Sequence, residues 1–173
     1  MHRTRFLLRI GSMIRPDRRA LLAGAAMLFA GPATAQGRRD AYADSPWRKL
    51  TDAEWRKRLP PASYRILRHE DTERAGTSPL NGEKRKGTFV CLGCELPLFS
   101  SATKYESGTG WPSFWRALPG AVTTKTDYKI GYPRTEYHCA RCLGHQGHVF
   151  DDGPRPTGLR YCNNGLALKF VPA

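Results

Sequence analysis

Two Cys-x-x-Cys pairs constrain the fold of this chain more than any other feature of its sequence. They are Cys91 with Cys94 and Cys139 with Cys142, and they use four of the five cysteines. Each pair can direct two thiolates to one point, and a structural zinc ion takes four ligands in a tetrahedron. We therefore predict one structural zinc ion per chain. Two disulfides are the alternative, but a Cys-x-x-Cys disulfide closes a very small loop and is usually a reactive redox pair.

Cys162 is the cysteine left without a partner, and it is a candidate nucleophile. Two histidines, His145 and His148, follow the second pair, and Asn164 comes shortly after Cys162. A nearby imidazole can lower the pKa of a thiol and serve as a proton donor. The alternatives are that Cys162 is an inert buried thiol and that the histidines are zinc ligands or ordinary core residues.

Residues 108–114 combine two glycines and a proline with two aromatic side chains, Trp111 and Phe114. Glycine and proline together favour a fixed turn. One interpretation of the stretch is a packed aromatic corner of the core. The other is an apolar pocket wall that holds a methyl group or a thioether.

Residues 1–35 are typical of an export signal. Arg18 and Arg19 precede an apolar run over residues 20–30, and small residues at 33–35 offer a cleavage position near Ala35 and Gln36. A membrane-spanning helix needs about 20 apolar residues, so we expect no membrane span. The paired arginines resemble a twin-arginine signal, which predicts an exported, periplasmic protein. The remaining chain divides into a flexible leader, residues 36–49, and one domain, residues 50–173.

The domain is expected to be mainly β with short helices in front. Thr51 and Glu54 have the spacing of a capping box, so a helix should follow and end before Pro60. A second helix is predicted over residues 62–69, and a surface loop over residues 71–86. Short β-type runs separated by turn residues then indicate antiparallel sheets. These runs cover residues 88–90, 121–124, 128–130, 135–137, 148–150, 159–161 and 166–170.

The formal net charge of +13 raises the question of nucleic-acid binding. The basic residues are dispersed, and export would separate the protein from nucleic acid, so we expect no such partner. A zinc-ribbon binding module would also leave Cys162 and the histidines without a role. A cysteine hydrolase that uses Cys162, His148 and Asn164 is a second alternative.

Three stretches, residues 107–114, 139–154 and 156–165, together resemble one known family. They are SGTGWPSF, CARCLGHQGHVFDDGP and PTGLRYCNNG, and in this order they resemble the B-type peptide-methionine (R)-S-oxide reductases, the methionine sulfoxide reductase B family. The similarity extends from about Leu50 to Phe170. It implies two antiparallel β-sheets of the β-tent type behind short helices, with zinc held by the four paired cysteines.

The resemblance also implies catalytic or substrate-binding roles for individual side chains of these stretches. Cys162 would attack the sulfoxide sulfur and become a sulfenic acid. His148, with His145, would polarise and protonate the oxygen, and Asn164 would hold that oxygen or its water. The substrate would contact Trp111 and Phe114, and Arg160 would stabilise the thiolate or the bound substrate.

One position departs from the family pattern. Many relatives carry a second cysteine where this chain has Thr109, and that cysteine closes a disulfide with the nucleophile. Thr109 cannot do so. We therefore expect a thioredoxin-like protein or a small thiol as the external reductant of Cys162. The substrates that the resemblance implies are oxidised proteins and peptides.

Overall fold

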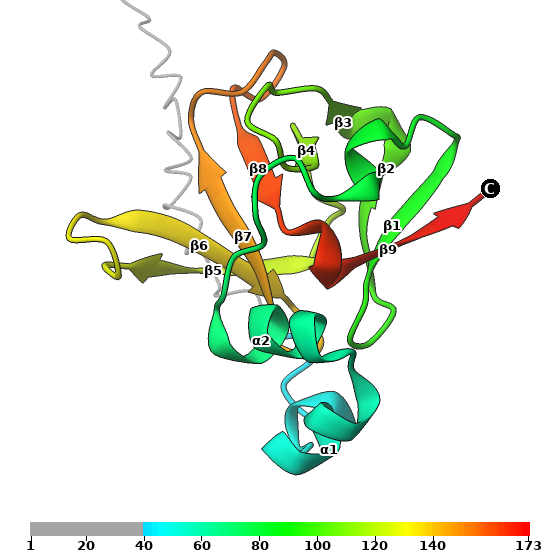
Figure 1. Cartoon of the computed structure of the whole chain (residues 1–173), viewed down its shortest axis with the longest axis vertical. Coiled ribbons are helices and arrows are strands. Elements are labelled where there is room, and N and C mark those ends of the chain that lie inside the picture. The colour runs from blue at the N-terminus through cyan, green and yellow to red at the C-terminus, as the bar shows by residue number, and fades with distance from the viewer. Residues whose placement is uncertain (1–39) are drawn as a thin grey trace, which may run out of the picture. The chain divides into compact units, whose positions relative to one another are not determined.

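The computed structural model describes residues 40–173 (Figure 1). The predicted export signal, residues 1–35, and its cleavage position lie outside the described residues. Within residues 40–173 no helix is long and apolar enough to cross a membrane.

Two short α-helices precede the sheets, as predicted. Helix α1, Asp52–Arg58, begins with the expected capping box: the Thr51 side chain accepts from the Glu54 amide, and Glu54 accepts from the Thr51 amide. Helix α2 covers Pro61–His69, one residue longer than predicted, because proline fits the first turn of a helix. Both helices direct apolar side chains into the core.

Residues 40–49 contact the domain, although the sequence suggested a flexible leader through residue 49. The Arg48 guanidinium donates to the Ala140 carbonyl at 2.6 Å and pairs with Asp40. The Trp47 ring stacks on Trp55 of α1 with ring centroids 5.9 Å apart. This segment therefore covers the end of the molecule at which the paired cysteines lie.

The nine strands within residues 40–173 form two antiparallel sheets, which confirms the predicted fold class (Figure 1). The smaller sheet has the order β2-β1-β9 and the larger one the order β3-β4-β8-β7-β6-β5. In the smaller sheet the strands are β1 (Gly87–Cys91), β2 (Pro97–Ser100) and β9 (Leu168–Pro172). In the larger sheet they are β3 (Lys104–Tyr105), β4 (Ser113–Phe114), β5 (Val122–Asp127), β6 (Arg134–Cys139), β7 (His145–Phe150) and β8 (Arg160–Asn163).

Some strand predictions were wrong in detail. Residues 128–130 lie in the turn of the β5–β6 hairpin and not in a strand. The Gly131 amide in this turn is bonded to the Tyr128 carbonyl at 3.0 Å. The last strand begins at Leu168 because Gly165–Ala167 form a 3₁₀ turn. Strands β2, β3 and β4 were missed, since they are short and flanked by turn residues.

The core between the two sheets is aromatic. Phe89 and Phe99 come from the smaller sheet, Phe114 and Tyr137 from the larger one, and all four are fully buried. Phe99 stacks on Phe114 with centroids 4.2 Å apart, and Phe89 meets the edge of Phe114 at 4.9 Å. Aromatic pairs of this kind add to the free energy gained by burial, so Phe114 is a central contact between the sheets.

Strands β7 and β8 approach closely at Gly147, which pairs with Asn163. A Cβ atom on Gly147 would lie 1.9 Å from the Cys162 carbonyl oxygen, closer than atoms can approach. The pairing that positions Cys162 beside His148 therefore requires glycine at this position.

We expect Gly147→Ala to lower the free energy of unfolding by about 1–3 kcal/mol, because the strands must separate to admit the methyl group. Gly82→Ala is the matched control, since a Cβ there meets nothing within 4 Å, and it should change stability by less than about 0.5 kcal/mol. Urea denaturation of both variants measures the difference. Equal stabilities would contradict the close packing of β7 on β8.

Candidate active site and metal centre

The two Cys-x-x-Cys pairs lie in two hairpin turns of the same construction. Cys91 ends β1 and Cys139 ends β6. In each turn, the residue after the second cysteine has a left-handed backbone, with φ of 58° at Glu95 and 60° at Leu143. The amides of these two residues bond back to the carbonyls of Cys91 and Cys139 at 2.7 and 2.9 Å. The turns therefore present their four thiols in matching ways, one turn from each sheet.

The four thiols fit a tetrahedral metal site. Their Sγ atoms all lie within 4.8 Å of one another and are buried. Cys91 and Cys142 are 3.6 Å apart, and Cys94 and Cys139 are 3.5 Å apart. A tetrahedron with Zn–S bonds of about 2.3 Å has S–S edges of about 3.8 Å, whereas a disulfide bond is about 2.05 Å long. The spacing thus matches metal ligands.

Gln146 connects this metal centre to the rest of the site. Its side-chain amide lies 3.4 Å from the Cys91 Sγ atom, in position to donate a hydrogen bond. Its backbone carbonyl accepts from the backbone and side-chain amides of Asn164, at 2.8 and 3.1 Å. One buried residue therefore contacts both the metal centre and Asn164.

A small cavity of about 140 Å³ brings together four of the predicted site residues. Cys162, His148, Asn164 and Trp111 all line it. Thr72, Arg134, Gly147, Phe150 and Asn163 complete its wall. Cavities for drug-sized ligands have about 300–1,000 Å³, so this one suits a single side chain.

Cys162 lies on the central strand β8, opposite Ser113 of β4 on one side and His148 of β7 on the other. Burial raises the pKa of its thiol, while the Arg160 charge and a hydrogen bond from the Thr109 side chain lower it in part. The thiol consequently keeps its proton at neutral pH until a ligand or base removes it. Thr109 contacts the candidate nucleophile, as the family pattern implies for this position.

His148 is held by Asp127, the last residue of β5 before the hairpin turn. Its Nε2 atom lies 2.8 Å from an Asp127 carboxylate oxygen, and Arg134 pairs with the same oxygen at 2.5 Å. The pKa of Asp127 lies well below its usual value because the Lys129 amide, His148 and Arg134 all stabilise the carboxylate. The sequence analysis missed Asp127 and Arg134, since an Asp and an Arg in a polar hairpin carry no recognisable motif.

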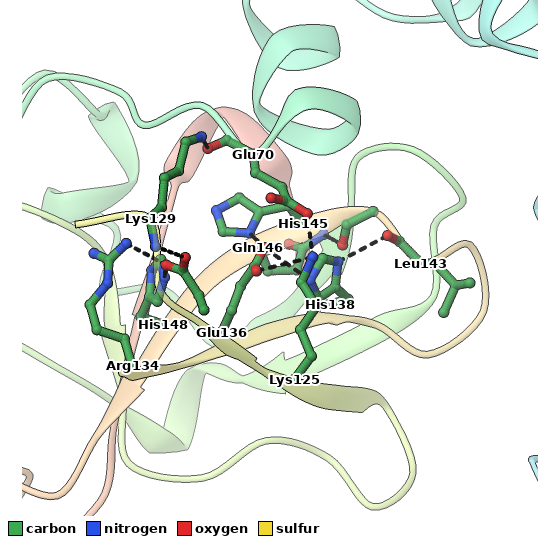
Figure 2. Close-up of polar contacts among 12 residues, drawn as sticks. Glu70, Lys125, Lys129, Arg134, Glu136, His138, Leu143, His145, Gln146 and His148 are labelled. Carbon is green, nitrogen blue, oxygen red and sulfur yellow. Dashed lines mark hydrogen bonds and ion pairs between the residues drawn. The ribbon is translucent and has the colours of Figure 1, made fainter. Parts of the chain in front are cut away.

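His145 is buried behind the cavity and does not line it. A β-bulge against Tyr137 and His138 shifts the alternation of β7, so His145 lies on the same side as His148, with ring centroids 5.7 Å apart. Glu136 accepts a hydrogen bond from His145 Nδ1 at 2.5 Å, as Figure 2 shows. Burial lowers the pKa of His145 to about 3. The ring is therefore neutral at pH 7, and its Nε2 lone pair faces the Asn164 side-chain amide at 3.5 Å.

Glu73 fixes two of the cavity residues from a loop that the sequence analysis treated as surface. Its backbone amide donates to the Asn164 side chain at 3.0 Å, and its carbonyl accepts from the Trp111 indole at 3.1 Å. Its buried carboxylate accepts from the amides of Gly165 and Leu166. Burial raises the pKa of this carboxyl. A lone glutamate in a loop gave no signal in the sequence.

The two remaining predicted residues do not line the cavity. Phe114 was predicted as a substrate contact, and the structure places it fully buried in the aromatic core. Arg160 forms a bidentate pair with Asp152 at 2.7 and 2.8 Å. Its guanidinium lies 4.3 Å above the Phe150 ring, which does line the cavity. The Arg160 charge lowers the pKa of Cys162, although Arg160 does not line the cavity.

Comparison with known proteins agrees with this arrangement. The family model of the SelR domain matches residues 59–172. The peptide methionine sulfoxide reductase MsrB of Leptospira interrogans is 54% identical over 121 residues, covering 69% of this chain and 92% of the relative. The MsrB of Agrobacterium fabrum is 50% identical over 129 residues, covering 74% and 96%, and that of Thiobacillus denitrificans is 54% identical over 123 residues, covering 70% and 93%.

The matched region includes both cysteine turns and every residue that lines the cavity. The identity exceeds half of the aligned positions in two of these relatives, and nearly their whole length is covered. With its two antiparallel sheets and its four clustered cysteines, the chain belongs to the SelR-domain family of B-type peptide methionine sulfoxide reductases.

Proposed function

We propose that this enzyme reduces the (R)-S-oxide of methionine residues in oxidised peptides and proteins, and so repairs them. The observation that carries the proposal is the cavity with Cys162 in its wall, flanked by Trp111, His148 and Asn164. Its small volume suits one oxidised methionine side chain, whose methyl group can pack on the indole. The membership in the family supports the same reaction.

Cys162 is the proposed nucleophile. Its sulfur attacks the sulfoxide sulfur, the S–O bond breaks, and the oxygen is transferred to Cys162 as a sulfenic acid. The substrate sulfur gains two electrons and becomes a thioether, while the Cys162 sulfur loses two. Since burial raises the pKa of the thiol, we infer that its proton leaves as the sulfoxide oxygen takes one up, so that charge does not build up in the cavity.

His148 is the proposed proton donor to the oxygen. It lines the cavity, and Asp127 fixes its orientation from the other side. His145 has a different role in this proposal from the one that the sequence suggested. It is neutral and outside the cavity, so it positions the Asn164 amide, which holds the oxygen or its water.

The four clustered cysteines are proposed to hold one structural zinc ion. A structural zinc ion takes four thiolates in a tetrahedral array, and the Sγ distances in the cluster fit it. Because one turn comes from β1 and the other from β6, the ion would join the two sheets. All four ligand positions are filled by protein, so the zinc takes no part in the reaction.

Export to the periplasm is also proposed, on the basis of Arg18, Arg19 and the apolar run that follows. The paired arginines are typical of the route that carries folded proteins, which would allow zinc to be bound before export.

The mature domain should reduce the R epimer of a methionine sulfoxide peptide and leave the S epimer unchanged, because each epimer has its own enzyme class. Assays with resolved epimers and a thiol reductant measure this. Cys162→Ser should lower the rate by at least about 10³-fold, since no other thiol lies in the cavity. Equal turnover of both epimers would refute the proposal.

Metal analysis should find one zinc ion per chain. Cys91→Ser and Cys139→Ser should each lose the metal and unfold the domain at lower temperature, because metal binding is coupled to folding. Cys162→Ser is the matched control and should keep both its zinc and its stability. An active, metal-free protein with two disulfides would contradict the site.

After one turnover without reductant, we expect Cys162 as a sulfenic acid with the zinc retained. The four other cysteines of the described domain are clustered at the metal centre, so a thioredoxin-like protein or a small thiol must attack Cys162 and form a mixed disulfide. Trapping with a dimedone-type reagent and mass spectrometry detects the sulfenic acid. An intramolecular disulfide to Cys162, with metal release, would rule out this route.

Replacing Arg18 and Arg19 by lysine in the full-length chain should prevent export while leaving the activity of the retained protein unchanged. Cell fractionation followed by the epimer assay measures both. Equal amounts of the unaltered and the substituted protein in the periplasm would exclude the twin-arginine route.

A further inference from the structure

The tip of the β5–β6 hairpin exposes three large side chains within five residues. Tyr128 is 68% exposed, Ile130 is 50% exposed and Tyr132 is 58% exposed. The other large exposed apolar residues of the described chain, Leu143, Leu159, Leu166 and Val171, belong to different turns and strands. Single exposed apolar residues are normal on a protein surface, whereas a cluster marks an interaction site. We call Tyr128, Ile130 and Tyr132 the hairpin tip.

The hairpin tip is held in place by hydrogen bonds at its base. The Gly131 amide bonds to the Tyr128 carbonyl at 3.0 Å, and the Lys129 amide bonds to Asp127 at 2.6 Å. The Lys129 ammonium reaches the Glu70 carbonyl at 3.0 Å, as Figure 2 shows. The exposed side chains therefore extend from a fixed turn, and their exposure costs free energy that a partner could recover.

The hairpin tip lies next to a residue pair that reaches the cavity. Asp127 of β5 and Arg134 of β6 form the last residue pair before the turn that carries the hairpin tip. Arg134 lines the cavity, and Asp127 holds His148, which lines it too. The hairpin projects beyond the other strands of the larger sheet, at the left of Figure 1. A chain that leaves the cavity past Arg134 would thus meet the hairpin tip first.

The basic residues of the hairpin are already paired. Lys125 forms an ion pair with Glu70, Lys129 bonds to the Glu70 carbonyl, and Arg134 pairs with Asp127. Two of these three cations are neutralised by a carboxylate, and the hairpin tip itself presents two phenol rings and an aliphatic side chain. Tyrosine offers apolar area and a hydroxyl at little cost in conformational entropy, as in many peptide-binding surfaces.

We propose that the hairpin tip is a docking surface for the polypeptide that flanks the oxidised methionine of an unfolded protein. The inference rests on the proposed function, in which the cavity binds an oxidised methionine side chain. A cavity of about 140 Å³ admits one side chain, so the flanking chain must lie outside it. A segment in extended form advances about 3.3 Å per residue, so its neighbouring side chains can reach the hairpin. Unfolded substrates are favoured because folded proteins bury the apolar side chains that would bind there.

The turnover test compares two substrates. Replacing Tyr128, Ile130 and Tyr132 together by serine should lower kcat/KM for an oxidised, unfolded protein about tenfold, which corresponds to about 1.4 kcal/mol. The same variant should reduce N-acetyl-methionine sulfoxide amide at the unaltered rate, since Asp127 and Arg134 are unchanged. Val171→Ser, at a residue of similar exposure in β9, is the control and should change neither rate.

A binding test separates this inference from the proposed reaction. Fluorescence anisotropy with the Cys162→Ser variant measures the affinity for a labelled, oxidised and unfolded polypeptide without turnover. The three serine substitutions should weaken it about tenfold. Unchanged binding, or an equal loss of rate on both substrates, would overturn the docking surface. A dimer of the unaltered protein that the substitutions dissociate would show instead that a second copy covers the hairpin tip. Failure of the unaltered enzyme to reduce either substrate would contradict only the proposed reaction.

Discussion

The close pairing of β8 with β7 is the constraint on which the rest of the site depends. Gly147 lets the two backbones approach, since any Cβ would meet the Cys162 carbonyl. The approach sets the register that places Cys162 opposite His148, while β4 supports the other side of β8. A β-bulge one step earlier turns His145 toward the same side. The cavity is therefore a product of strand register, and small changes in the sheet would separate its members.

Three carboxylates then orient the side chains that the strands bring together. Asp127 holds His148, Glu136 holds His145, and Glu73 anchors the turn after Asn164. Each comes from a different element, so the site is supported from β5, from β6 and from the loop after α2. Buried polar groups are costly when left unpaired. The paired carboxylates thus restrict the histidines and the asparagine to one arrangement.

The metal centre and the cavity lie at opposite ends of strand β7. β7 begins next to the second cysteine turn and ends at the cavity wall, with Gln146 between them. The aromatic core joins the sheets on one side of this strand, through Phe99 and Phe114. A zinc ion would join them at the turns, so the two contacts together explain how a small domain with short strands holds a precise site. Phe114 belongs to this core and does not line the cavity.

The sequence by itself determined the features that are local in the chain. The capping box at Thr51, the cysteine turns and the candidate nucleophile Cys162 could be predicted because spacing and residue type fix their chemistry. The tertiary structure alone decided which side chains reach the cavity. It buried Phe114 and His145 away from the cavity lining. It also placed Asp127, Arg134 and Glu73, which lie in segments without a motif, at the cavity or in contact with its residues. Their positions depend on sheet register and on a bulge, which arise from contacts between residues distant in sequence and leave no pattern in the sequence around them.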